Sequence, residues 1–400
     1  MDQITEGALR AGYHRAQDPS LTQREIGERA NLGGQAQVSR LLTVARERGY
    51  LREVFEFPPE LPEDDRQRVQ DSFFRRHSEL ESALKERARE LNAARSAGGS
   101  PFKRLHVVAA PGLEDGGAQA RDRAFQSFGA NAAEIVAGYI DEASTCSVAW
   151  GRTISTTVRH IRSRPAAAPG QAVAKLFMPI AGEPTNFEPN GVSPSDAAQT
   201  LAAAWPDSRH LSLRGVQARI PKSVHEKDKG EIARELISYS RNYRQIFGPL
   251  AGNERPLIAQ VAMILTGIGD ASTSAREGEP PERADPWYSE TSEAESPEVL
   301  GLAVGNLGGV WLTPSDAPRE DKDKVDQVND RWLGAKHDDF KRCSLNADMP
   351  TRPGVVVVAV EPEKAEIVLE ALYLINVLIV SRQLAEALAK APDIGLMSQT

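Results

Sequence analysis

The stretch LTQREIGERANLGGQAQVSRLLTVARERGY, residues 21–50, has the pattern of two short helices joined by a glycine turn. Thr22 is placed to cap the first helix, and Glu25, three residues later, can complete a capping box with it. Gly33-Gly34 supplies a turn that tolerates positive φ. The second helix has one apolar face, formed by Val38, Leu41, Leu42 and Ala45. The pattern predicts a helix-turn-helix and makes DNA the first partner to consider.

The opposite face of the second predicted helix is polar. Its side chains are of types that contact base edges or phosphates, and we expect DNA contacts from Gln35, Gln37, Ser39, Arg40 and Arg46. Helix-turn-helix geometry is also common outside DNA-binding proteins. A plain helical hairpin with a solvated polar face therefore stays open as the alternative interpretation.

The chain has 400 residues, which is enough for more than one domain. Its formal net charge at pH 7 is −8, but residues 40–52 carry four arginines and one glutamate. Acidic residues gather elsewhere, in residues 60–65 and 277–298. A small basic head on an acidic body fits DNA binding by the head alone.

Several classes of protein are excluded by what the sequence lacks. No run approaches the roughly 18 apolar residues of a membrane-spanning helix, and the N-terminus is polar, so we expect no membrane contact and a cytoplasmic location. Cys146 and Cys343 lie far apart and form neither a disulfide framework nor a zinc cluster. The seven histidines show no metal or triad spacing. We expect no metal and no cofactor.

Proline and glycine clusters divide the chain into three predicted parts. Residues 1–56 form the helix-turn-helix domain, which ends in a short strand or wing near residues 50–54. Residues 57–100 hold a polar helix that either connects the domains or pairs two chains. The apolar stripe that favours pairing is Val69, Phe73, Leu80, Leu84 and Leu91. Residues 101–400 form an α/β effector domain.

Apolar stretches alternate with helical patterns throughout residues 101–400. We therefore predict a doubly wound, mostly parallel sheet with helices on both faces. The predicted strands are residues 105–110, 147–150, 174–180, 210–213, 258–266, 300–304, 355–360 and 377–380. The predicted helices include residues 118–140, 195–204, 230–243 and 362–372. In such a sheet, ligands bind at the carboxyl ends of the strands.

Glycine loops follow several of these strands. Gly151-Arg152-Thr153 opens a helix, where backbone N–H groups and the helix dipole favour an anion. Lys364 begins a helix after residues 355–360, where we expect its ammonium group to face a bound phosphate. The other loops contain Gly182, then Gly267, Gly269 and Asp270, then Gly305 and Asn306. One such loop alone predicts only a tight turn, but four at one sheet edge indicate an anion site.

The order of these motifs resembles that in the SorC/DeoR-type sugar-binding transcriptional regulators. The motifs are LTQREIGERA with QVSRLL, AWGRTISTTV, LTGIGD, AVGNLGG, VNDRWLG, and VVVVAVEPEKAEIVLEAL followed by INVLIVSRQLAEAL. The resemblance covers nearly the whole chain. It implies an N-terminal helix-turn-helix that binds double-stranded operator DNA, a NagB/RpiA/CoA-transferase-like effector domain, and a homo-oligomer, either a dimer or a tetramer.

The resemblance also implies a small anionic effector, a phosphorylated sugar. In the family, positions matching Gly151-Arg152-Thr153, residues 267–269, Asn306 and Lys364 surround it, and Arg219 falls in a loop that faces the same site. Thr153 would hold the phosphate and Lys364 would neutralise it. The sequence departs from the family in an acidic insertion at residues 270–297, a polar insertion at 314–324, and the residues Asn306 and Tyr373.

Two other functions stay open. A sugar-phosphate isomerase-like enzyme needs a general base, for which Asp270 and Glu361 are the candidates. Neither lies beside a histidine in sequence, and catalysis leaves the DNA-binding head unexplained, so we expect no enzyme and no catalytic residues. The other is a DNA-binding scaffold whose pocket has lost its ligand, which the altered positions Asn306 and Tyr373 favour.

Overall fold

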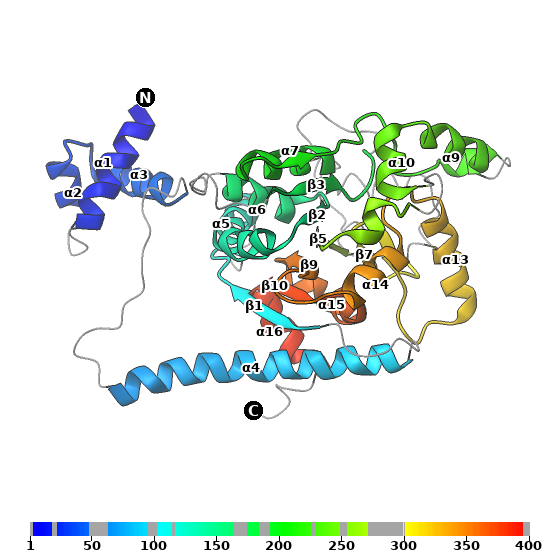
Figure 1. Cartoon of the computed structure of the whole chain (residues 1–400). Coiled ribbons are helices and arrows are strands. Elements are labelled where there is room, and N and C mark those ends of the chain that lie inside the picture. The colour runs from blue at the N-terminus through cyan, green and yellow to red at the C-terminus, as the bar shows by residue number, and fades with distance from the viewer. Residues whose placement is uncertain are drawn as a thin grey trace. The chain divides into compact units, whose positions relative to one another are not determined.

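The structure, a computed structural model, describes most of the chain (Figure 1). The described residues are 3–17, 22–47, 63–94, 102–113, 117–162, 174–183, 193–225, 229–248, 254–270, 299 and 301–394. The chain divides into two compact units, Met1–Phe74 and Arg75–Thr400.

The first unit contains the predicted helix-turn-helix. Its helices are α1 (Gln3–Gln17), α2 (Gln23–Arg29) and α3 (Gln35–Glu47), and they enclose a core of Ala8, Ala11, Ile26, Val38, Leu41, Leu42 and Ala45. The predicted capping box is present, because the N–H of Thr22 donates to the Glu25 carboxylate at 2.7 Å and the N–H of Glu25 donates to the Thr22 hydroxyl at 3.3 Å. The expected wing at residues 50–54 lies outside the described residues.

The turn between α2 and α3 differs from the prediction. Asn31 adopts a φ of 50°, whereas Gly33 and Gly34 do not have positive φ. Asparagine tolerates the left-handed region because its short polar side chain can hydrogen-bond locally. The glycine that packing requires is inside α2, since a Cβ on Gly27 would lie 2.9 Å from the carbonyl oxygen of Gly33.

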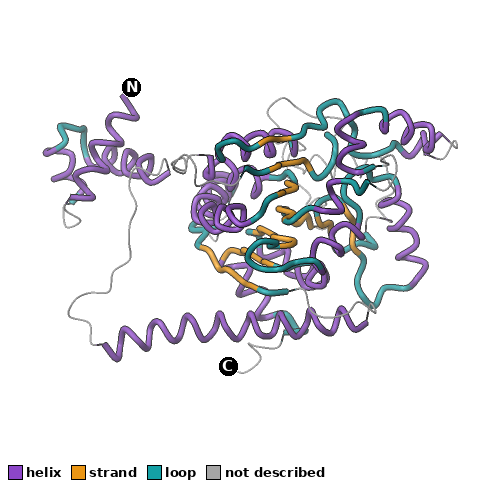
Figure 2. The backbone as a smooth tube through the Cα atoms, in the orientation of Figure 1, coloured by secondary structure: helices purple, strands orange, loops and turns teal. Residues whose placement is uncertain are grey.

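The second unit is built on a seven-stranded sheet with the order β1-β10-β9-β5-β2-β3-β4, drawn in orange in Figure 2. The strands are β1 (Arg104–Val108), β2 (Thr145–Val148), β3 (Leu176–Pro179), β4 (Arg209–His210), β5 (Met263–Thr266), β9 (Gly354–Ala359) and β10 (Val377–Ser381). Every pairing in this sheet is parallel. The carboxyl ends of its strands therefore share one edge, as the predicted fold class requires.

Helices cover both faces of the sheet. One face packs against α5 (Ala118–Glu142), α6 (Arg152–Arg162) and α7 (Pro194–Ala204), and the other against α14 (His337–Leu345), α15 (Ala365–Ala371) and α16 (Arg382–Lys390). Along β9, Val356 and Val358 pack on the face that α5, α6 and α7 cover, whereas Val355 and Val357 pack on the opposite face. This two-sided burial explains the uninterrupted run of valines.

The long helix α4 (Glu63–Ala94) contributes to the second unit. Leu80, Leu84 and Leu91 are buried there and belong to the core that also contains residues of α15 and α16. These leucines are therefore internal packing residues, and they do not form the exposed pairing stripe that the sequence suggested. The side chains of Val69 and Phe73 lie outside the described ones.

Three short strands form a second, antiparallel sheet that the sequence did not predict. They are β6 (Ile268–Asp270), β7 (Gly305–Leu307) and β8 (Val310–Leu312), in the order β6-β7-β8. The described residues 301–304 do not form the strand that was expected at residues 300–304. Strand β7 begins directly after them, at Gly305. The remaining acidic insertion, residues 271–297, lies outside the described residues.

Several predicted elements are divided differently in the structure. Residues 258–266 form a 3-10 turn η2 (Leu257–Gln260) before β5, because an apolar run alone does not distinguish a strand from a helical turn. Residues 230–243 form α9 (Gly230–Ser238) and α10 (Arg241–Phe247), since Ser240 caps a new helix. Helices also occur at α8 (Lys222–Val224), α13 (Arg319–Asp330), η4 (Pro362–Lys364) and η5 (Leu372–Leu374).

Candidate functional site

The segments after β2, β5 and β9 meet at the carboxyl edge of the parallel sheet. Gly151 follows β2, Gly267 follows β5, and η4 follows β9. A Cβ on Gly267 would lie 3.8 Å from the carbonyl oxygen of Val358 and 3.9 Å from the side chain of Ile154. The structure therefore brings these three predicted segments close together.

Four charged side chains gather at this edge, and we call them the cationic cluster: Arg121, Arg152, Glu361 and Lys364. The carboxylate of Glu361 lies 2.9 Å from the Lys364 ammonium group, 3.8 Å from Nε of Arg121 and 3.9 Å from Nη2 of Arg152. Arg121 comes from α5, Arg152 begins α6, and the other two follow β9. With three cations around one carboxylate, the cluster carries a net charge of +2.

Members of the cluster differ in their access to solvent. The side chain of Glu361 is 4% exposed and that of Lys364 is 12% exposed. Arg152 is 51% exposed, and its guanidinium group lies over the Phe125 ring, 4.8 Å from the centroid. A ligand approaching from solvent therefore meets Arg152 before it meets Lys364.

The electrostatics of the cluster fix the charge of Glu361. Burial raises the pKa of the Glu361 carboxyl, but Lys364, Arg152 and Arg121 together lower it further, so that it lies at about 2. Glu361 is therefore an anion at neutral pH and a weak proton acceptor. This argues against the general-base role that the enzyme alternative gave to it.

The lowered pKa leads to a prediction for acid stability. A carboxyl with a pKa near 4.5 when unfolded and about 2 when folded stabilises the fold above pH 4.5, and this contribution is lost as the pH falls toward 2. Between pH 6 and pH 3, we expect wild type to lose about 2 kcal/mol more unfolding free energy than Glu361→Gln. Urea denaturation of both chains at the two pH values checks this. Equal losses would contradict the ion-pair geometry.

The turn before α6 supplies backbone donors beside the cluster. Gly151 has a φ of 112°, a conformation that favours glycine, and its carbonyl accepts from the N–H of Ser155 at 2.9 Å. Helix geometry then leaves the N–H groups of the first turn, which includes Arg152 and Thr153, without carbonyl partners inside the helix. Thr153 itself is buried. Residues 151–153 thus form the anion-favouring helix start that the sequence predicted.

Two of the three other predicted glycine loops are strands in the structure. The chain runs from β5 through Gly267 directly into β6, where Gly269 pairs with Asn306 of β7. A Cβ on Gly269 would overlap the amide of Asn306, and the Oδ1 atom of Asn306 accepts from the N–H of Gly309 at 3.2 Å. Asn306 therefore holds the turn between β7 and β8. The side chain of Asp270 lies outside the described ones.

Gly182 and Arg219 are both closely packed within the second unit. A Cβ on Gly182 would overlap the carbonyl oxygens of Val216 and Gln217, where the two segments approach closely. Arg219 is buried, and its charge acts on Lys336 and is not among the charges that lower the pKa of Glu361. Neither residue joins the cationic cluster.

Tyr373, one of the positions at which the sequence departs from the family, lies away from the cationic cluster. It lies nine positions after Lys364 along a helical segment, which corresponds to a rise of about 14 Å. Its hydroxyl group instead lies 2.8 Å from Nε2 of His337, at the start of α14. Tyr373 therefore joins α14 to the segment before β10.

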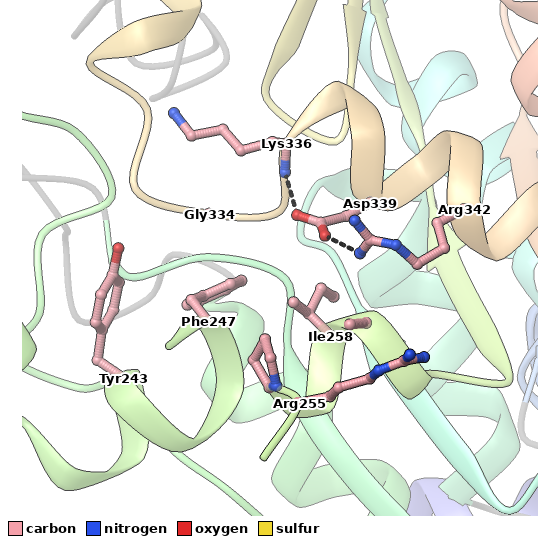
Figure 3. Close-up of a pocket in the computed structure, with 10 residues that line it drawn as sticks. Tyr243, Phe247, Arg255, Ile258, Gly334, Lys336, Asp339 and Arg342 are labelled. Atoms are coloured by element: carbon pink, nitrogen blue, oxygen red, sulfur yellow. Dashed lines mark hydrogen bonds and ion pairs between the residues drawn. The ribbon is translucent and has the colours of Figure 1, made fainter. Parts of the chain in front are cut away.

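A pocket of about 660 Å³ lies between α10, η2 and residues 334–342 (Figure 3). Its lining is Tyr243, Phe247, Arg255, Pro256, Ile258, Ala259, Gly334, Lys336, Asp339 and Arg342. It contains none of the residues that the sequence assigned to a site.

Three polar residues of this pocket, Lys336, Asp339 and Arg342, bind one another or nearby backbone. Burial lowers the pKa of Lys336 to about 8, and its ammonium group donates to carbonyls at the end of α13, including that of Asn329 at 2.8 Å. Asp339 accepts from the N–H of Lys336 at 2.9 Å and pairs with Arg342 at 2.8 Å. The cationic cluster is the stronger candidate because it lies at the carboxyl ends of parallel strands.

Sequence reasoning missed the contribution of Arg121 and gave Glu361 a different role. No spacing in the chain links Arg121 with Glu361, because their proximity depends on how α5 packs beside the sheet.

Within the described part of the chain, no group of three or more His, Cys, Asp or Glu side chains is arranged to hold a metal ion. None of the helices described there is long and apolar enough to cross a membrane.

The helix-turn-helix presents the expected polar face. Gln35, Gln37 and Arg40 are exposed on α3, and Ser39 is half-buried. The side chain of Arg46 lies outside the described ones. Because the apolar side of α3 is fully used in the core of the first unit, the exposed polar side is the part of this helix that a partner can contact.

No family model matches the chain, and neither does any curated protein. The full-length sorbitol operon regulator SorC from Klebsiella pneumoniae has a TM-score of 0.52 and 18% identity, covering 98% of this chain and 100% of that one. A DeoR family transcriptional regulator from Listeria monocytogenes has a TM-score of 0.43 and 14% identity, and the match covers 71% of this chain and 92% of that one. A transcriptional regulator from Streptococcus pneumoniae has a TM-score of 0.46 and 13% identity, and the match covers 76% of this chain and 95% of that one. The first similarity confirms the predicted fold over nearly the whole chain.

Proposed function

We propose that this chain is a ligand-responsive transcriptional regulator of the SorC/DeoR type. Its helix-turn-helix binds operator DNA, and its α/β unit senses a small phosphorylated metabolite, a sugar phosphate, at the cationic cluster. The observation that carries the proposal is that one chain combines the exposed polar face of α3 with a cluster of net charge +2 at the strand ends. The fold similarity to a full-length operon regulator supports it.

DNA binding follows from the chemistry of α3. A recognition helix enters the major groove and contacts bases with residues in its N-terminal part, where Gln35, Gln37 and Arg40 are exposed. Amides pair with adenine and guanidinium groups with guanine. Such regulators bind two half-sites as dimers, so we also propose a homodimer or tetramer. Because the leucines of α4 are buried within the chain, we expect other surfaces to form the contact between subunits.

We expect Arg40→Ala to weaken operator binding by about 5- to 150-fold, because one good base contact contributes about 1–3 kcal/mol. The matched control is Arg10→Ala, which removes an arginine of α1 that pairs with Glu6. Fluorescence anisotropy at fixed salt measures both, with a duplex that wild type has selected from a random library. Unchanged affinity of Arg40→Ala would remove this residue from the interface.

Effector binding follows from the charge and donors at the strand ends. A phosphate group there meets the N–H groups at the start of α6, the guanidinium group of Arg152 and the ammonium group of Lys364. An unphosphorylated sugar lacks the charge that these groups favour. This difference supports a phosphorylated sugar as the class of effector.

A thermal-shift comparison of sugar phosphates with the corresponding free sugars tests this class. A ligand at 100 times its dissociation constant stabilises the folded state by about 2.7 kcal/mol. We expect at least one sugar phosphate to raise the melting temperature and its free sugar to have no effect. If free sugars stabilise equally, or if no phosphate ester does, the proposed effector class is wrong.

A further inference from the structure

Glu361 occupies the position at the cationic cluster that an anionic ligand would need. Its carboxylate contacts Lys364 through one oxygen at 2.9 Å and lies within 4 Å of both arginines through the other. The carboxylate is almost fully buried, and the charged groups that act on it come from three separate elements, α5, α6 and η4. The ligand-free cluster thus already holds an anion.

The tether of this carboxylate determines what can compete with it. Glu361 immediately precedes η4, so its side chain stays beside the cations at an effective concentration on the order of millimolar or more. A ligand with one negative charge offers the cations no more charge than Glu361 does. A phosphate monoester carries a charge of about −1.5 to −2 at pH 7, so the same three cations attract it more strongly than they attract a monoanion.

We propose that Glu361 is a built-in counter-ion of the effector site, which competes with the effector for Arg121, Arg152 and Lys364. This rests on the proposed function and adds a specificity rule to it. The site accepts dianionic phosphate esters and rejects monoanions such as sugar acids, because only a dianion outcompetes the tethered carboxylate. Glu361 also keeps the cations together in the ligand-free protein.

The test measures binding of inorganic phosphate and of gluconate, a sugar acid, by calorimetry at pH 7.5 and matched ionic strength. Glu361→Gln removes the charge at nearly constant size, and we expect it to bind phosphate at least tenfold more tightly than wild type. We also expect its preference for phosphate over gluconate to fall. The matched control is Glu370→Gln on α15, whose carboxylate lies 3.7 Å from Arg87 and accepts from the N–H of Ser315. It should bind phosphate as wild type does.

A second variant guards against failure of Glu361→Gln to fold. Glu361→Asp keeps the charge but withdraws it by one methylene, so its phosphate affinity should also exceed that of wild type. Equal or weaker phosphate binding by the folded variants would overturn the proposal, because it would make Glu361 a residue that positions the cations for the ligand. If neither phosphate nor any sugar phosphate binds wild type or variants, the effector site itself is wrong, and the counter-ion role falls with it.

Discussion

Replacing Leu84 with alanine is expected to lower the free energy of unfolding of the second unit by about 3 kcal/mol. Leu84 is fully buried in a core that also contains Leu105 of β1 and Leu388 of α16. A buried leucine-to-alanine change costs about 2–5 kcal/mol, because apolar contacts are lost and a cavity is left. Urea denaturation measures the loss. Glu86→Ala on the same helix, where the side chain is exposed, is the control and should change little.

The dependence on protein concentration decides between two roles for this helix. If Leu84 packs within its own chain, the loss is the same at every protein concentration. If it packs against a second chain, stability depends on concentration through mass action. A loss below about 1 kcal/mol, or one that disappears as concentration rises, would contradict the intramolecular packing of α4.

The second large effect is expected from Lys364→Met. This change leaves the buried carboxylate of Glu361 without its nearest cation, at 2.9 Å. Removing one partner of a buried ion pair costs about 3–5 kcal/mol, and we expect the lower end because Arg121 and Arg152 remain within 4 Å. Urea denaturation at pH 7 measures the loss.

A double-mutant cycle separates the ion pair from simple packing. In Glu361→Gln with Lys364→Met, no buried charge is left uncompensated, so we expect the double variant to recover at least half of the stability that Lys364→Met loses. The same cycle with Glu370→Gln in place of Glu361→Gln should show no recovery, because Glu370 pairs with Arg87. Additive losses in the Glu361 cycle would mean that the two side chains do not interact.

The sequence predicted the elements whose pattern is set by burial. The run of valines in β9 is apolar because both faces of that strand are covered, and the alternating faces of α3 follow from its one-sided core. The helix start at residues 151–153 was also predictable, since a glycine with positive φ must join β2 to α6. These features depend on short-range patterns along the chain.

Features set by tertiary packing were not predictable from such patterns. The stripe on α4 indicates that an apolar surface covers it, but not which one, and here the cover is the same chain. Gly269 and Asn306 look like loop residues because strands of three residues leave almost no periodic signal. The contact between Arg121 and Glu361 joins segments 240 residues apart, and only the packing of α5 on the sheet creates it.

Coupling between effector and DNA is the central claim, and one titration tests it directly. The full chain is titrated onto the selected duplex with and without a saturating amount of the sugar phosphate that stabilises it most, and anisotropy gives the two DNA affinities. We expect these to differ by at least about fivefold, as an allosteric coupling of 1 kcal/mol or more requires. In Arg152→Gln, whose exposed side chain can be changed without opening the core, the difference should shrink. Equal DNA affinities, measured while calorimetry shows the ester bound, would contradict the claim.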